Sequence, residues 1–236
     1  MGRAFEFRKA RKMKRWASMA KTFTRIGKDI VIAVKEGGPS PETNAKLRVV
    51  IQNAKTANMP KDNIQRAIKN ASEKNNENYK EIVLEGYGPH GIAVIVDCTT
   101  DNNNRTVANI RSYFNKTKGN LGINGSVEYL FDKFCVFKIV MCPEHEELEL
   151  ELIDYGLEEM VIDDEENEII IYAKFESFGE IQTILEKKNI EIKSSEIEKL
   201  PKKTIDLDQE KKEEFESFLE MCDEDNDVQK IHHNCS

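Results

Sequence analysis

The sequence predicts a multidomain α+β protein, in which an N-terminal three-helix domain precedes two α+β domains, one inserted in the other. Two observations support this prediction. Apolar residues recur at helical spacing through the first 74 residues, and the period changes to that of strands after residue 78. The charge changes at the same place: residues 1–74 carry 18 Lys and Arg against 6 Asp and Glu, whereas the other 162 residues carry 17 against 37.

The N-terminal third predicts a basic arm followed by three helices. Residues 3–16 are rich in Lys and Arg but have too few apolar residues to build a core, so we expect an arm or a loosely docked helix. A first helix is predicted from Met19 to the Gly37-Gly38 pair, and a second one after Pro41. A third begins at Pro60, because the missing N–H of proline costs nothing in the first turn of a helix. We assign residues 1–78 to this basic helical domain.

Beyond a polar linker that ends near residue 78, short strands and helices alternate. Strands are predicted over residues 81–84, 92–96, 126–131, 134–140, 160–162, 168–172, 190–197 and 228–233. Helices are predicted over residues 106–114, 144–155, 175–188 and 208–222. The order lacks a long βαβαβ alternation, which favours antiparallel or mixed sheets with helices on one face. We therefore expect two ferredoxin-like domains, one formed by residues 79–140 and 205–236 and the other inserted over residues 141–204.

Composition indicates a soluble, cytoplasmic protein. Hydrophobic residues make up 39% of the chain, and no run approaches the ~20 apolar residues that cross a bilayer. No apolar stretch follows the basic start, so we expect no secretory signal and no membrane partner. The five cysteines are odd in number and lack a CxxC spacing, which is typical of reduced thiols in the cytosol.

Three motifs suggest ligand chemistry, and each is better explained by structure. Gly86-x-Gly88-x-x-Gly91 matches the dinucleotide fingerprint, but a strand follows it instead of a helix, which favours a tight turn. The string Asp223-x-Asp225-x-Asp227 opens like a calcium loop, yet the required glycine and the closing glutamate are absent. The paired histidines at 232 and 233 would point to opposite faces of a strand. We predict no metal ion, no cofactor, no catalytic residue and no enzymatic activity.

A strip of positive charge is the candidate functional surface. A protein that neutralises several phosphates at once binds polyanions with steep salt dependence and little regard for sequence. We expect Lys21, Arg25 and Lys28 on the polar side of the first helix, and Lys61 and Lys69 on the exposed face of the third. The candidate nucleic-acid-binding residues are Arg3, Arg8, Lys9, Arg11, Lys12, Lys14, Arg15, Lys21, Arg25, Lys28, Lys61 and Lys69.

A second candidate contact cluster lies between a predicted strand and a predicted helix. It consists of Asn102, Asn104 and Arg105. The segment caps the helix that begins near Thr106 in one interpretation. In the other, its amides and guanidinium bind a nucleic-acid backbone or a peptide. The sequence leaves both interpretations open.

Several strings resemble one known family. They are Ala57-Asn58-Met59-Pro60-Lys61-Asp62-Asn63-Ile64, Glu85-Gly86-Tyr87-Gly88-Pro89, Thr100-Asp101-Asn102, Asn104-Arg105-Thr106-Val107, Gly119-Asn120-Leu121-Gly122, Gly125-Ser126-Val127 and Asp227-Val228-Gln229-x-Ile231-x-His233-Asn234. In these strings the chain resembles the YebC/PmpR family, which includes mitochondrial translational activators of cytochrome oxidase synthesis. The resemblance implies three domains around a cleft and no enzymatic activity. The first residues depart from the Gly-His-Ser-Lys-Trp start that is usual in the family, so base contacts made by that start are not carried over.

The charge distribution and the resemblance together predict a non-enzymatic, nucleic-acid-binding regulator of gene expression. Family members are described as DNA-binding transcriptional regulators, and this is our leading interpretation. The alternative is a translation factor that binds ribosomal RNA on the ribosome and aids synthesis through stalling, proline-rich stretches. The partner is nucleic acid in both cases. We expect a monomer, because no dimer signature marks the basic domain.

Overall fold

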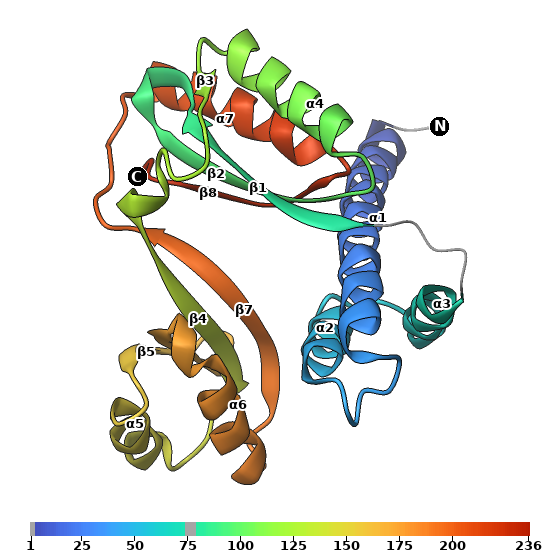
Figure 1. The fold of residues 1–236 in the computed structure, drawn as a ribbon, viewed down its shortest axis with the longest axis vertical. Helices are drawn as coiled ribbons and strands as arrows, with labels where there is room; N and C mark the ends of the chain where they lie inside the picture. The colour runs from blue at the N-terminus through green and yellow to red at the C-terminus, as the bar shows by residue number, and fades with distance from the viewer. Residues whose placement is uncertain (1–2, 74–78) are drawn as a thin grey trace.

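The computed structural model describes residues 3–73 and 79–236, with side chains from Met19 onward. It has three parts, shown in Figure 1. We call them the helical unit (residues 3–73), the sheet A unit (residues 79–130 and 202–236) and the sheet B unit (residues 131–201). Each of the last two is built on a four-stranded antiparallel sheet. The α+β class is confirmed.

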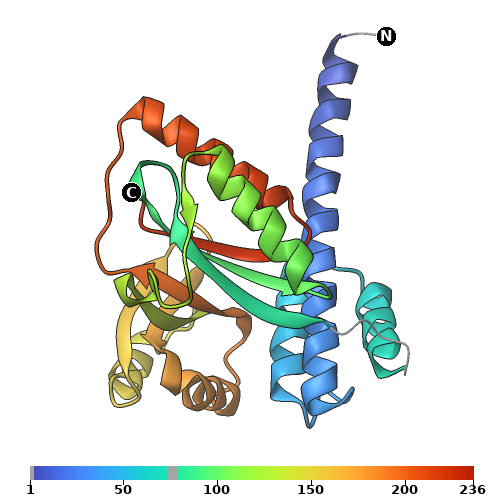
Figure 2. The same ribbon diagram turned by 45° about the horizontal axis from the view of Figure 1, so that its top comes forward.

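The helical unit consists of α1 (Arg3–Gly37), α2 (Ala45–Thr56) and α3 (Lys61–Ser72). The predicted start of the first helix at Met19 is wrong, because residues 3–18 continue α1 without a break. They contain neither Gly nor Pro and many Arg, Lys and Ala, whose helix propensity is high. In Figure 2, α1 extends past the other elements toward its N-terminus. Ile30, Leu47 and Ala54 are fully buried where the three helices pack.

The sheet A unit carries its two helices on one face of the sheet. Its elements are β1 (Lys80–Tyr87), the turn η1 (Pro89–Gly91), β2 (Ala93–Thr100), α4 (Asn103–Lys116), β3 (Asn120–Leu121), η2 (Glu128–Leu130), α7 (Gln209–Glu224) and β8 (Val228–His233). The strand order is β3-β1-β2-β8. Phe114 from α4 and Phe218 from α7 meet edge to face at 4.9 Å between ring centroids, in a core completed by Val94 and Val96 of β2.

The opposite face of sheet A is covered by a loop that the sequence predicts as a strand. The Glu85 carboxylate is buried and accepts hydrogen bonds from the backbone N–H groups of Gly125 (2.8 Å), Val127 (3.0 Å) and Glu128 (2.9 Å). Because these donors are bound to a side chain, they are not available to a strand ladder. The prediction of a strand over residues 126–131 is therefore wrong, and β4 starts only at Phe131.

The glycines of the Gly86-x-Gly88-x-x-Gly91 string serve close packing and a turn. Gly86 lies in β1, where a Cβ atom would clash with the backbone of Asn120 and lie 2.9 Å from the Phe114 ring. Gly91 ends the turn η1 between β1 and β2, with a φ of +77°. The interpretation of this string as a turn between strands is confirmed.

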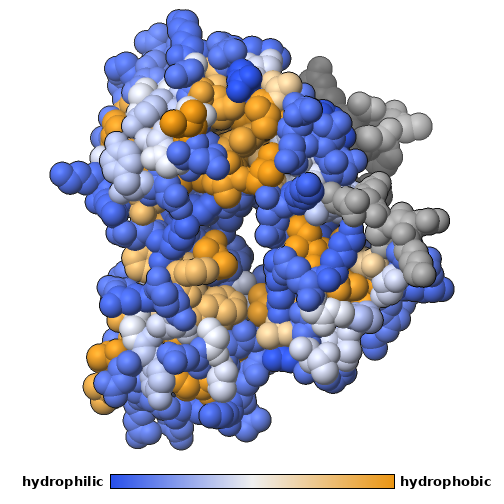
Figure 3. Space-filling view, viewed as in Figure 1, coloured by the Kyte–Doolittle hydropathy of each residue, from blue (hydrophilic) through white to orange (hydrophobic). Residues whose placement is uncertain are grey.

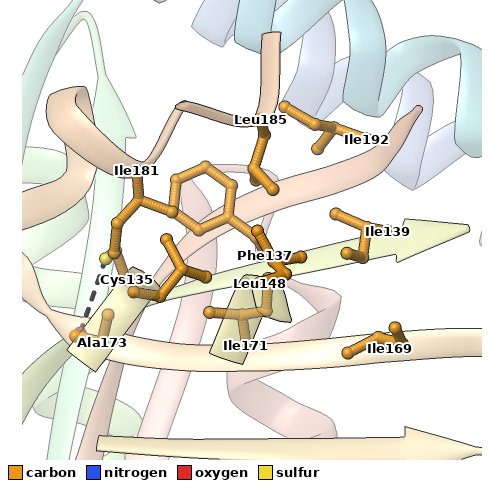
Figure 4. Packing of buried hydrophobic residues seen from close by; sticks show 11 residues of the cluster. Cys135, Phe137, Ile139, Leu148, Ile169, Ile171, Ala173, Ile181, Leu185 and Ile192 are labelled. Atoms are coloured by element: carbon orange, nitrogen blue, oxygen red, sulfur yellow. Dashed lines mark hydrogen bonds between the residues drawn. The ribbon is translucent and has the colours of Figure 1, made fainter. Parts of the chain in front are cut away.

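The sheet B unit has the βαββαβ order of a ferredoxin-like fold. Its elements are β4 (Phe131–Val140), α5 (His145–Ile153), β5 (Leu157–Asp163), β6 (Glu168–Lys174), η3 (Phe175–Ser177), α6 (Phe178–Lys187) and β7 (Ile192–Pro201). The strand order is β5-β6-β4-β7. Figure 4 shows its core, in which Phe137 packs against Leu148, Ile171 and Ile181. Because β4 pairs with β6 and β7, the inserted unit begins at residue 131 and not at 141 as predicted.

Polar contacts join the three parts. In the contact of α2 with β7, the Asn53 amide donates to the Ser195 carbonyl (2.8 Å) and accepts from the Ser195 N–H (3.1 Å). Lys230 of β8 pairs with Glu196 and Glu198 of β7, at 2.6 Å each. Figure 3 shows an opening between the three parts. Among the helices described, none is long and apolar enough to cross a membrane.

Replacing Gly86 with Ala should lower the free energy of unfolding by about 1–3 kcal/mol, because the new methyl group has no space against Asn120 and Phe114. Urea denaturation measures this change. Gly27→Ala is the matched control: nothing lies within 4 Å of its Cβ position in the middle of α1, so it should stabilise by about 0.5–1 kcal/mol. Equal stability of wild type and Gly86→Ala would contradict the packing described for β1.

Candidate nucleic-acid interface

A buried ion cluster forms where the helical unit meets the sheet A unit. At its centre is Asp227, just before β8, with a side chain only 7% exposed. Its Oδ1 lies 2.9 Å from Nζ of Lys28. Its Oδ2 accepts from Arg105 (2.7 Å), Thr106 (2.8 Å) and Thr100 (3.2 Å). One carboxylate therefore links α1 with β2 and α4.

The ammonium group of Lys28 is bound entirely by protein atoms of this cluster. Besides Asp227, its ammonium group donates to the carbonyl oxygens of Thr99 (2.9 Å) and Asn226 (2.7 Å). All three of its donors thus have protein partners. The side chain is 8% exposed, so Lys28 cannot reach a phosphate, and its prediction as a nucleic-acid contact is wrong.

The hydrogen bonds hold Asp227 in its charged form. Burial alone would raise the pKa of a carboxyl group. The bonds from Arg105, Lys28 and Thr106 outweigh burial and lower the pKa of Asp227 to about 2. The cluster is therefore intact across the whole neutral and mildly acidic range.

Lys21 and Arg25 also face the sheet A unit. Arg25 donates to the Asp223 carboxylate (2.8 Å) and to the Val228 carbonyl (2.8 Å), and Lys21 lies 3.5 Å from the same carboxylate. Both were predicted as nucleic-acid contacts on the polar side of the first helix. The structure places both against the same carboxylate, that of Asp223, which offsets part of their charge. An amphipathic pattern identifies the polar side of a helix but not the carboxylates that a later segment brings to it.

The remaining predicted cations of α1 lie outside the side chains that the structure describes. They are Arg3, Arg8, Lys9, Arg11, Lys12, Lys14 and Arg15, all on the N-terminal half of α1. Their contact with nucleic acid stays a prediction.

An exposed cationic surface is present on α2 and α3. We call Lys55, Lys61, Arg66 and Lys69 the α2–α3 patch; all four are exposed. In the described part of the chain, no ion pair joins any of them to a carboxylate. Lys61 and Lys69 stand on the exposed face of α3, as predicted. Lys55 and Arg66 were missed, although Lys55 lies in the last turn of α2, six residues before Lys61.

The residues of the second predicted cluster have different roles: Asn102 caps α4, and Arg105 belongs to the ion cluster around Asp227. Asn102 is the N-cap of α4, and its side chain accepts from the Arg105 N–H (3.1 Å). The Arg105 guanidinium pairs with Asp101 and Asp227, at 2.7 Å each. The capping interpretation is confirmed for Asn102. Asn104 is exposed.

The comparison with known proteins agrees with this architecture. A profile of the TACO1/YebC N-terminal domain matches residues 3–74, and one of the TACO1/YebC second and third domain matches residues 79–235. The chain belongs to the TACO1/YebC family. It is 60% identical to a probable transcriptional regulatory protein of Flavobacterium johnsoniae, over 99% of this chain and 98% of the relative. A protein of the same description from Porphyromonas gingivalis is 53% identical, over 99% and 97%.

A solved structure shares the fold of this TACO1/YebC protein. It is the crystal structure of a conserved hypothetical protein of Aquifex aeolicus, with a TM-score of 0.77 and 37% identity, covering 92% of this chain and 90% of that one. The strings that carry the family resemblance hold the fold together here. Glu85 fixes a loop, Asp227 joins two units, and Asn234 accepts from the Ala93 N–H (2.8 Å).

Replacing Asp227 with Asn should lower the free energy of unfolding by about 3 kcal/mol at pH 7, because it leaves Lys28 buried without a counter-ion. The folded pKa lies below the unfolded one, so the contribution of the carboxylate is complete above about pH 4 and is lost as the pH falls through about 2. The difference between wild type and variant should shrink over that window. Urea denaturation at a series of pH values measures it.

Asp223→Asn is the matched control for this experiment. The Asp223 side chain is 54% exposed, and an exposed pair contributes less than about 1 kcal/mol. A loss as large for Asp223→Asn as for Asp227→Asn would contradict the central position assigned to Asp227.

Proposed function

We propose that this protein regulates gene expression by binding nucleic acid through its helical unit, as a DNA-binding transcriptional regulator in the cytoplasm, and that it acts without catalysis. The observation that supports the proposal most strongly is the segregation of charge. Residues 1–74 carry a net charge of +12, in a chain whose total is −8. Such a concentration of cations increases the affinity for nucleic acid, because binding releases counterions from the phosphates.

The cations of the helical unit fall into two groups, one paired with carboxylates and one exposed to solvent. Lys21, Arg25 and Lys28 are paired with carboxylates of the sheet A unit. The α2–α3 patch faces solvent, and Lys61 and Lys69 lie eight residues apart on one helix face, about 12 Å along its axis. Two cations at that spacing contact separate phosphates of one backbone. The probable transcriptional regulatory proteins named above agree with DNA as the partner.

The burial of two thiols makes them poor candidates for a catalytic cysteine. Burial raises the pKa of Cys135 to about 11 and that of Cys222 to about 12. Thiols with such pKa values stay protonated at neutral pH and are poor nucleophiles.

Replacing both Lys61 and Lys69 with Glu should weaken binding to every nucleic acid sequence and reduce the slope of log K against log salt by about 2 on duplex DNA, since each lost phosphate contact removes about 0.9. Fluorescence anisotropy of a labelled duplex over a salt series measures the slope. The melting temperature should not change, because both side chains are exposed. A control protein carries Lys187→Glu and Lys203→Glu, which alter the net charge equally at exposed positions outside the helical unit.

The outcomes separate the candidate functions. A reduced slope for the α3 variant alone, together with a footprint on one promoter that survives competitor DNA, supports transcriptional regulation. Sequence-indifferent DNA binding with salt-labile sedimentation on ribosomes would instead favour the translation factor. An unchanged slope for the α3 variant would remove Lys61 and Lys69 from the contact surface.

A further inference from the structure

One segment of the acidic part of the chain contains no acidic residue. Residues 75–236 carry 37 Asp and Glu, yet residues 102–127 carry none and hold four cations. The four are Arg105, Arg111, Lys116 and Lys118. This segment forms α4, the turn into β3, β3 itself and the loop that follows, and all four cations lie on α4 or in the turn. A net charge of +4 is thus concentrated on one helix of the sheet A unit and its C-terminal turn.

The polar residues of α4 fall on two sides with different roles. On the side near the end of α7, Asn109 and Tyr113 both donate to the Asp225 carboxylate, at 3.1 Å each. On the outward side, Asn104, Arg111 and Asn115 follow the i, i+7, i+11 spacing of a single helix face. These three are exposed. The core-facing residues Thr106, Ile110 and Phe114 are buried on a different side of the helix.

The outward face continues beyond the helix into the following turn. Lys118 is exposed and follows the C-cap Thr117 directly. We call Asn104, Arg111, Asn115 and Lys118 the α4 face. In the described part of the chain, neither Arg111 nor Lys118 has an ion pair with a carboxylate. Arg105, by contrast, pairs with Asp101 and Asp227.

The α4 face is oriented by the same ion cluster that docks the helical unit. Arg105 at the start of α4 and Lys28 of α1 share the Asp227 carboxylate, so the N-terminal end of α4 is fixed beside α1. Figures 1 and 2 both show α4 beginning next to α1, and in Figure 2 α1 continues past it toward the N-terminus. A polyanion that lies along α1 would therefore pass the N-terminal end of α4.

We propose that the α4 face is a second contact site for the phosphodiester backbone of the bound nucleic acid. The inference rests on the proposed function and extends it from the helical unit to the sheet A unit. Arg111 and Lys118 would pair with phosphates, and the amides of Asn104 and Asn115 would donate to phosphate or sugar oxygens. The positions from 104 to 115 span about 16 Å along the helix, enough for several phosphates of one strand.

The acidic helix α7 limits the site on one side. Glu210, Glu213 and Glu214 of α7 line a cleft with Lys116 and Lys118 at the C-terminal end of α4. These glutamates lie beside Lys118, so a polyanion would approach Lys118 from the side that faces away from α7. Because backbone contacts do not read sequence, the site should bind DNA and RNA alike and add affinity without specificity.

The test is a protein with Arg111→Glu and Lys118→Glu, measured by fluorescence anisotropy with a labelled duplex DNA and, separately, a labelled single-stranded RNA. On duplex DNA the slope of log K against log salt should become less negative by about 2. Affinity should fall roughly tenfold or more at low salt. The protein with Lys187→Glu and Lys203→Glu is the matched control, because it has the same net charge and its changed residues lie outside the α4 face. Circular dichroism should show an unchanged fold.

Each outcome decides the proposal. A lower slope for the α4 variant and not for the control supports it, and the DNA and RNA arms show which nucleic acid reaches the site. Wild-type binding with equal slopes for the α4 variant and the control would overturn the second site while leaving the helical unit as the contact surface. Failure of the wild type to bind either probe would overturn the proposed function itself.

Discussion

The buried Asp227 carboxylate is the constraint on which the arrangement of the parts depends. It is the common partner of Lys28 from the helical unit and Arg105 from α4. A buried charge without its partners costs several kcal/mol, so the three groups must stay together in the folded state. The positions of α1 relative to sheet A and of the start of α4 follow from that requirement. The contact of Asn53 with Ser195 then holds the sheet B unit against α2.

This constraint also sorts the cations by function. Lys21 and Arg25 of α1 pair with Asp223, and Lys28 pairs with Asp227. The α2–α3 patch, in contrast, is exposed. The sheet B unit carries 7 Lys against 20 Asp and Glu over residues 131–201. A polyanion is therefore attracted to the helical unit and repelled by the sheet B unit. Under the proposed function, this distribution of charge would set the orientation of a bound nucleic acid as well as its affinity.

Sequence periodicity predicted the class of the fold and most of its elements, because helix and strand patterns depend on local burial. It failed where a distant group decides the local structure. Residues 126–131 have strand-forming residues, but the Glu85 carboxylate binds their N–H groups. The domain boundary was misplaced because strand β4 is adjacent in sequence to sheet A and pairs in sheet B. Lys28 has the spacing of a surface lysine, and only the fold shows Asp227 beside it.

The free energy of unfolding and the salt slope of DNA binding, measured together on Lys28→Met, test this account most directly. The account predicts a loss of stability of about 3 kcal/mol, because Asp227 loses its buried partner, and a salt slope equal to that of the wild type. Unchanged stability with a slope reduced by about 0.9 would place Lys28 on a phosphate and contradict the account.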